Sequence, residues 1–224
     1  LRKEPAIGVD PVIHAKDFRG ASMWRDTDAV ESWSWDGCEG SRTGVVVYAD
    51  ADTVQLLVNG RSVGRKKVKE CKALFSKVTY EPGEIEAIAL DAAGRETGRA
   101  RLISATGATK LKLSPERTLL RANGQDLCFL DIDLVGENGV TRSSVDQKLT
   151  VEVTGAGTLQ AFGSARPHMA EDFVSASHTT YYGKALAVIR AGYEPGEIRV
   201  KVSGKDMEEE ITLRVTADDS WEKM

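Results

Sequence analysis

Two tryptophans separated by a single residue, Trp33 and Trp35, are the clearest chemical signal in this sequence. On a β-strand, side chains two residues apart point to the same face, so the two indole rings could together stack on the C–H faces of sugars. The alternative is that one or both rings fill the protein core or an interface between domains. Aromatic residues make up only 6% of the chain, which favours the second interpretation. The sequence leaves both open.

A second candidate for ligand contact is the segment 162–174, which carries Arg166 and His168. It runs for about a dozen residues without apolar alternation, which is long for a connection in a compact domain. Long loops are either functional or simply mobile. Arg166 and His168 are therefore candidate carbohydrate-binding residues, together with the tryptophan pair.

The histidines do not indicate a catalytic triad or a metal centre. His14, His168 and His178 are widely spaced, and no serine lies in a nucleophile-elbow pattern beside them. Zinc sites need closely spaced histidine, cysteine or carboxylate ligands, and the nearest grouping is His168 with Glu171. We expect neither a metal nor a cofactor.

Acidic pairs also occur, but their spacing does not fit glycoside hydrolysis. Asp50 and Asp52, like Asp131 and Asp133, alternate with apolar residues and are expected on the solvent face of strands. A glycosidase instead needs two carboxylates roughly 5–10 Å apart that flank a sugar in a cleft. The sequence therefore predicts that this chain catalyses nothing by itself.

Composition excludes some partners. Lys and Arg number 30 against 34 Asp and Glu, a net charge of −4, which argues against nucleic acid because phosphate binding needs a basic excess. No apolar run approaches the roughly 20 residues of a membrane span. The cysteines are Cys38, Cys71 and Cys128, an odd number that gives no disulfide framework and leaves a Cys38–Cys71 bridge open.

The elements that position these residues are best read from a repeated hexapeptide. The sequence YEPGEI occurs at residues 80–85 and again at 193–198, each time before an alternating strand. Proline fixes φ at the second position of a tight turn and glycine accepts a positive φ at the third. A repeat at this distance has the length of one immunoglobulin-like sandwich, which predicts that such a domain occurs twice.

Short alternating segments fill the rest of the chain, with Gly, Pro, Asn and Asp between them, and no stretch has a helical period. This pattern is typical of an all-β protein. We predict two tandem immunoglobulin-like, fibronectin III-like β-sandwich domains. The expected division is an N-terminal linker or extension over 1–25, a first sandwich over 26–106, a second over 107–217, and a tail over 218–224.

One resemblance adds a family. The run TDAVESWSWDGCEG at 27–40 and the strand–strand–NG hairpin of 45–64 resemble the segment that follows the catalytic barrel in bacterial β-galactosidases of glycoside hydrolase family 2. Residues 163–167, 171–173 and 183–191 are similar to the last β-sandwich domain of that family. There a G-x-G-x-P loop is usual, and Ser164 and Ala165 depart from it.

The resemblance implies a non-catalytic C-terminal region that braces a catalytic TIM barrel of the same polypeptide and shapes access to substrate. No residue here matches the two glutamates of that barrel. Because the chain begins at Leu1 and not at Met, we expect an excised fragment. A β-galactoside or polysaccharide ligand, homo-oligomers of the parent enzyme, and a periplasmic or extracellular location are further expectations.

Two alternative functions stay open at the level of sequence. The first is a carbohydrate-binding module that uses Trp33, Trp35 or the 162–174 loop. The second is a cell-surface, adhesin-like pair of tandem domains without an attached enzyme.

Overall fold

The computed structural model describes residues 4–13 and 27–217. The chain divides into two compact units, Leu1–Thr106 and Gly107–Met224, which are described separately. The described residues form sixteen strands and no helix, so the all-β prediction of β-sandwich domains is confirmed.

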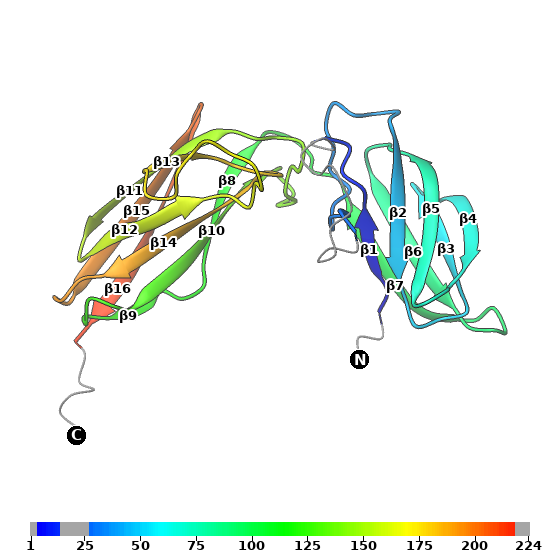
Figure 1. Cartoon of the computed structure of the whole chain (residues 1–224), viewed down its shortest axis with the longest axis horizontal. Coiled ribbons are helices and arrows are strands. Elements are labelled where there is room, and N and C mark those ends of the chain that lie inside the picture. The colour runs from blue at the N-terminus through cyan, green and yellow to red at the C-terminus, as the bar shows by residue number, and fades with distance from the viewer. Residues whose placement is uncertain (1–3, 14–26, 218–224) are drawn as a thin grey trace, which may run out of the picture. The chain divides into compact units, whose positions relative to one another are not determined.

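The first unit is a sandwich of two antiparallel sheets (Figure 1). A three-stranded sheet has the order β1-β2-β5, and a four-stranded sheet has the order β4-β3-β6-β7. The strands are β1 (Ala6–Val9), β2 (Arg42–Tyr48), β3 (Thr53–Val58), β4 (Arg61–Lys67), β5 (Lys72–Thr79), β6 (Glu84–Leu90) and β7 (Glu96–Ile103). Alternating residues of both sheets, among them Val45, Val47, Leu56 and Ile85, fill the space between them.

Strand β1 corrects the expectation of a linker over residues 1–25. Ala6–Val9 pairs with β2 from Ala6 opposite Tyr48 to Val9 opposite Val45. Ile7 and Val9 are buried, so this short segment belongs to the first sandwich. A strand of four residues, in a segment bounded by Pro5 and Pro11, carries too little alternation to be recognised from sequence. The remainder of the expected linker, residues 14–25, lies outside the described residues.

The second unit is a larger sandwich (Figure 1). One sheet has the order β12-β14-β10-β8 and the other the order β13-β11-β15-β16-β9. The strands are β8 (Lys110–Pro115), β9 (Leu119–Arg121), β10 (Leu127–Val135), β11 (Lys148–Gly155), β12 (Gly157–Gly163), β13 (Ser177–Thr179), β14 (Lys184–Ala191), β15 (Gly196–Gly204) and β16 (Met207–Thr216). Its core is almost wholly aliphatic, with Phe162 as the large aromatic exception.

The repeated hexapeptide occupies equivalent corners of the two sandwiches. Residues 80–85 lead from β5 in one sheet to β6 in the other, and residues 193–198 lead from β14 to β15 in the same way. The two tyrosines nevertheless differ, because Tyr80 is fully buried whereas Tyr193 is 77% exposed. The repeat therefore predicts the corner but not the environment of its first residue.

All three cysteines are free thiols, with Cys71 exposed, Cys38 half-buried and Cys128 buried. The disulfide that the sequence left open between Cys38 and Cys71 is not formed in this structure.

Candidate functional site

The tryptophan pair lies in the interior of the first unit. Both Trp33 and Trp35 have no exposed surface. The Trp33 ring meets the Tyr80 ring edge-on, with centroids 5.0 Å apart, and its Nε1–H donates to the carbonyl of Glu81 at 3.0 Å. Neither indole has a face open to solvent on which a sugar could stack in this conformation.

Hydrogen bonds around the Tyr80 hydroxyl fix the tryptophan backbone. The hydroxyl accepts from the Trp35 N–H at 3.0 Å and lies 3.4 Å from Ser104 Oγ. Ser104 Oγ in turn donates to the carbonyl of Trp33 and accepts from the Gly83 N–H. Burial raises the pKa of Tyr80, although its hydrogen bonds with Ser104 and Trp35 oppose that shift. These hydrogen bonds stabilise the interior of the first unit, which indicates a structural role for Trp33, Trp35 and Tyr80.

In the second unit, the loop between β12 and β13 is held by a carboxylate clamp. The two oxygens of Glu171 accept from the backbone N–H and the hydroxyl of Thr179, at 3.1 and 2.9 Å. Burial acts to raise the pKa of Glu171, but these bonds outweigh it and lower the pKa. Asp172 Oδ1 accepts from the N–H groups of Val174 and Ser175, which closes a turn at the loop tip.

A ring stack anchors the same loop to the sandwich. Phe173 stacks on the fully buried His178, with ring centroids 5.8 Å apart and planes 16° apart. The Phe173 carbonyl accepts from the N–H of Phe162 at 2.8 Å. A Cβ on Gly163 would lie 2.2 Å from the Phe173 ring, so the ring needs glycine at that position. The loop therefore has a defined conformation.

The other two predicted site residues lie in this loop. Arg166 is half-buried and places its guanidinium 5.8 Å from the centroid of the Tyr181 ring, while His168 is exposed. Trp33 and Trp35 belong to the first unit and Arg166 and His168 to the second, so no single unit contains all four.

An apolar strip that sequence reasoning missed crosses the outer face of the β12-β14-β10-β8 sheet. Phe129 pairs with Val188, and Leu186 pairs with Gly163, against which the Phe173 ring lies. Residues paired across a ladder share a face, so these side chains are neighbours. The members of the apolar strip are Phe129, Val188, Leu186 and Phe173, with Val174 beside them at the loop tip.

Several members of the apolar strip are unusually exposed for their type. Phe129 is 42% and Phe173 51% exposed, and Val174 beside the strip is 84% exposed. Apolar residues at outward positions of β10 and β14, where polar residues are expected, were the available sequence signal.

The first unit contributes a hollow of about 390 Å³ on the outer face of the β1-β2-β5 sheet. It is lined by Asp10, Thr27, Val46, Tyr48, Lys72 and Leu74, among others. Partial burial, and secondly the charge of Asp28, raise the pKa of Asp10. The Lys72 ammonium lies 5.7 Å from the centroid of the Tyr48 ring. Polar and apolar groups thus converge in one depression.

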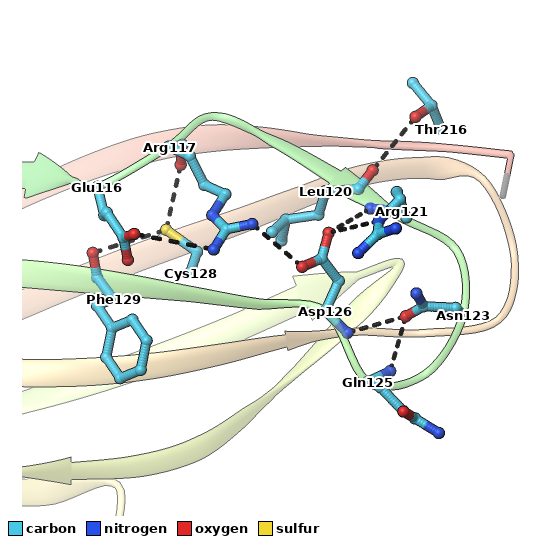
Figure 2. A network of polar contacts seen from close by, with 10 residues as sticks. All are labelled: Glu116, Arg117, Leu120, Arg121, Asn123, Gln125, Asp126, Cys128, Phe129 and Thr216. Carbon is cyan, nitrogen blue, oxygen red and sulfur yellow. Dashed lines mark hydrogen bonds and ion pairs between the residues drawn. The ribbon is translucent and has the colours of Figure 1, made fainter. Parts of the chain in front are cut away.

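A polar network ties together one end of the second unit (Figure 2). The Asp126 carboxylate accepts from the Arg121 N–H at 2.9 Å and pairs with the Arg117 guanidinium at 3.2 Å. Asn123 Oδ1 accepts from the N–H groups of Gln125 and Asp126, both at 2.9 Å. These bonds hold the turn into β10, and the Thr216 hydroxyl, which donates to the Leu120 carbonyl, joins β16 to β9, which indicates a structural role.

Within residues 4–13 and 27–217, no group of three or more histidine, cysteine and carboxylate side chains could hold a metal ion. No helix of sufficient length and hydrophobicity to span a bilayer occurs in the same residues. His14, one of the three histidines, lies outside them.

Two protein families match parts of the chain. Residues 111–213 match glycoside hydrolase family 2 C-terminal domain 5, and residues 40–98 match a domain of unknown function, DUF4982. The two matches fall within the second and the first unit, respectively.

Similar proteins are much longer than this chain. The chain is 28% identical over 204 residues to the β-galactosidase BoGH2A of Bacteroides ovatus, which covers 88% of the chain and 23% of the relative. A solved structure of a glycosyl hydrolase family 2 member from Bacteroides cellulosilyticus is 29% identical with a TM-score of 0.84, covering 96% of this chain and 29% of that one. A second structure from that species is 30% identical with a TM-score of 0.80, covering 93% and 28%. The chain therefore spans about a quarter of each of these three relatives.

Proposed function

We propose that this chain, which belongs to glycoside hydrolase family 2 as a C-terminal accessory region, serves a longer β-galactosidase-like enzyme by bracing its catalytic domain and shaping access to substrate. The lengths of the relatives support a larger polypeptide, since the chain spans 23% of BoGH2A and 29% of a solved family member. The β-galactosidase name of BoGH2A supports β-galactosides as the substrate class.

The observation that carries the bracing role is the apolar strip. Soluble domains rarely leave neighbouring large apolar side chains exposed unless another surface covers them. Phe129 is 42% and Leu186 is 37% exposed on adjacent strands, and Phe173 extends the strip to the loop. The proposed occupant is the catalytic domain of the same polypeptide, because the relatives have that additional length.

The rigid loop supports the second half of the proposal, which is shaping access to substrate. Val174 is 84% exposed at the tip, yet the Asp172 turn and the Glu171 clamp hold the backbone beneath it. An ordered loop can form a fixed rim beside a cleft, because little conformational entropy is lost when it contacts a ligand or a neighbouring domain.

The test is made in the longer polypeptide, with hydrolysis of a nitrophenyl β-galactoside and thermal unfolding as readouts. Replacing Phe129 and Leu186 together by serine should lower the Tm of the catalytic domain. A phenylalanine side chain has about 200 Å² of surface, so an exposed fraction of 42% leaves about 80 Å² of Phe129 in contact with solvent. Covering that apolar area stabilises the contact by about 2 kcal/mol. The isolated chain should lose little stability with the same changes, since both side chains face solvent there.

Leu119, which is 55% exposed on β9, offers the matched control. Leu119→Ser should leave the longer polypeptide unchanged. If the double variant and this control behave alike in the longer polypeptide, the apolar strip is not the bracing surface. If the longer polypeptide lacks β-galactosidase activity, the proposed substrate class is wrong.

A further inference from the structure

The hollow on the first unit has the size and chemistry of a small polar-ligand site. Its volume of about 390 Å³ lies within the range of small-molecule sites, about 300–1,000 Å³. Val46 and Leu74 are paired across β2 and β5 and both line the hollow, so they supply adjacent apolar side chains, of which Val46 is buried and Leu74 is 65% exposed. Tyr48 and Lys72 are paired on the same face, one pleat further along.

Hydrogen-bond acceptors and donors line the same hollow. Asp10 supplies a carboxylate, the half-buried Lys72 supplies an ammonium, and the hydroxyl-bearing residues Thr27 and Ser76 also line the hollow. A carboxylate only accepts hydrogen bonds and an ammonium only donates them. Together they can therefore accept from the O–H of a ligand hydroxyl group and donate to its oxygen. Polyols present many such hydroxyls beside apolar C–H faces.

The Asp10 side chain occupies space that is open because residue 44 is a glycine. A Cβ on Gly44 would lie 2.0 Å from Asp10 Oδ2, so the carboxylate rests directly on the Gly44 backbone. The Asp10 N–H donates to the Gly44 carbonyl at 2.9 Å, and Thr43 Oγ1 donates to the Asp10 carbonyl at 2.7 Å. The backbone that carries this carboxylate is therefore fixed at the edge of the hollow.

We propose that this hollow binds a neutral oligosaccharide, whose hydroxyls donate to Asp10 and accept from Lys72 while its C–H face lies on Val46 and Leu74. That the sugar is β-linked rests on the proposed function. The site is separate from the apolar strip of the second unit and from Trp33 and Trp35. It gives the accessory region a ligand of its own, in addition to the proposed bracing role.

The experiment follows backbone amide resonances of the 224-residue chain during titration with β-1,4-linked galactotetraose and, separately, glucotetraose. Saturable shifts should appear at Gly44, Lys72 and Leu74. Asp10→Asn and Lys72→Met should each weaken binding by about tenfold or more, as when a hydrogen bond to a charged group is lost. Thermal unfolding of each variant shows whether it folds like the parent chain.

Matched controls come from the same chain. Asp50→Asn and Lys67→Met remove the same charges at exposed positions outside the hollow and should leave the affinity unchanged. Absence of saturable shifts with both sugars would overturn the site, and so would shifts that persist unchanged in Asp10→Asn and Lys72→Met. Either failure leaves the bracing proposal intact, because that is read from hydrolysis and Tm in the longer polypeptide.

Discussion

Replacing Tyr80 by phenylalanine isolates what one buried hydroxyl contributes to the first unit. The ring stays, so its edge contact with Trp33 is kept. The hydroxyl that is removed accepts from the Trp35 N–H and also hydrogen-bonds with Ser104 Oγ. The repeated hexapeptide supplies an internal control, since Tyr193 occupies the equivalent corner of the second unit but is 77% exposed.

The expected effect follows from burial. A buried N–H left without an acceptor costs about 1–3 kcal/mol, and the Trp35 N–H lies in the fully enclosed part of the corner. Tyr193→Phe removes a hydroxyl that water already solvates, so a change below about 0.5 kcal/mol is expected. With a urea m-value of about 2 kcal/mol/M, Tyr80→Phe should lower the urea midpoint of the first unit by about 1 M.

Urea unfolding followed by tryptophan fluorescence measures this directly, because Trp33 and Trp35 are both buried in the first unit. Amide hydrogen exchange in β6 and β15 assigns the loss to one unit or the other. A Tyr80→Phe variant within 0.5 kcal/mol of the parent chain would refute the argument. Equal losses for Tyr80→Phe and Tyr193→Phe would refute it as well.

Further predictions concern charge. Burial raises the pKa of Tyr80 in the folded state. The stability of the first unit should therefore fall as pH rises from about 10, where tyrosine in the unfolded chain ionises. Urea titrations at alkaline pH should show a smaller fall for Tyr80→Phe. The pKa of Glu171 is lowered by folding, so its contribution is present above about pH 4.3 and lost as pH falls through the lowered value. Protection of the Thr179 N–H against hydrogen exchange, relative to its intrinsic rate, should fall over that acidic window, and Glu171→Gln should remove this pH-dependent change. Asp126→Ala should destabilise the second unit by about 1–3 kcal/mol in urea, since the Arg121 N–H and the Arg117 guanidinium lose their acceptor (Figure 2). An exposed control, Asp131→Ala, should change little.

The hexapeptide and the alternating strands were sufficient to predict the all-β sandwich fold from sequence. Alternation with a period of two and the proline–glycine pair of a turn are properties of short segments. Both can therefore be recognised without knowing which other strands pack against them. Strand β1 was not predicted because four residues carry little periodic signal. Its register against β2 is set only when the two strands pair.

The candidate site depended more on tertiary structure. The sequence predicts that Trp33 and Trp35 share one face of a strand, but residues 31–35 lie outside the strands and Ser34 is buried as well. Only the packing around Tyr80 shows that both rings are interior. His178 and Phe173 likewise meet only because the loop folds back onto Gly163.

The sequence by itself determined the strand period, the two equivalent corners, the near-neutral charge and the family resemblance, since each is a local or additive property of the chain. Alternation also predicted the solvent face of a strand such as β10, but only the tertiary structure decided which distant residues meet. The apolar strip needs the pairing of β10 with β14, and the hollow needs β1, β2 and β5 in one sheet. Neither exists until strands from distant parts of the chain pair, because a strand's exposed face is defined by what packs on the other one.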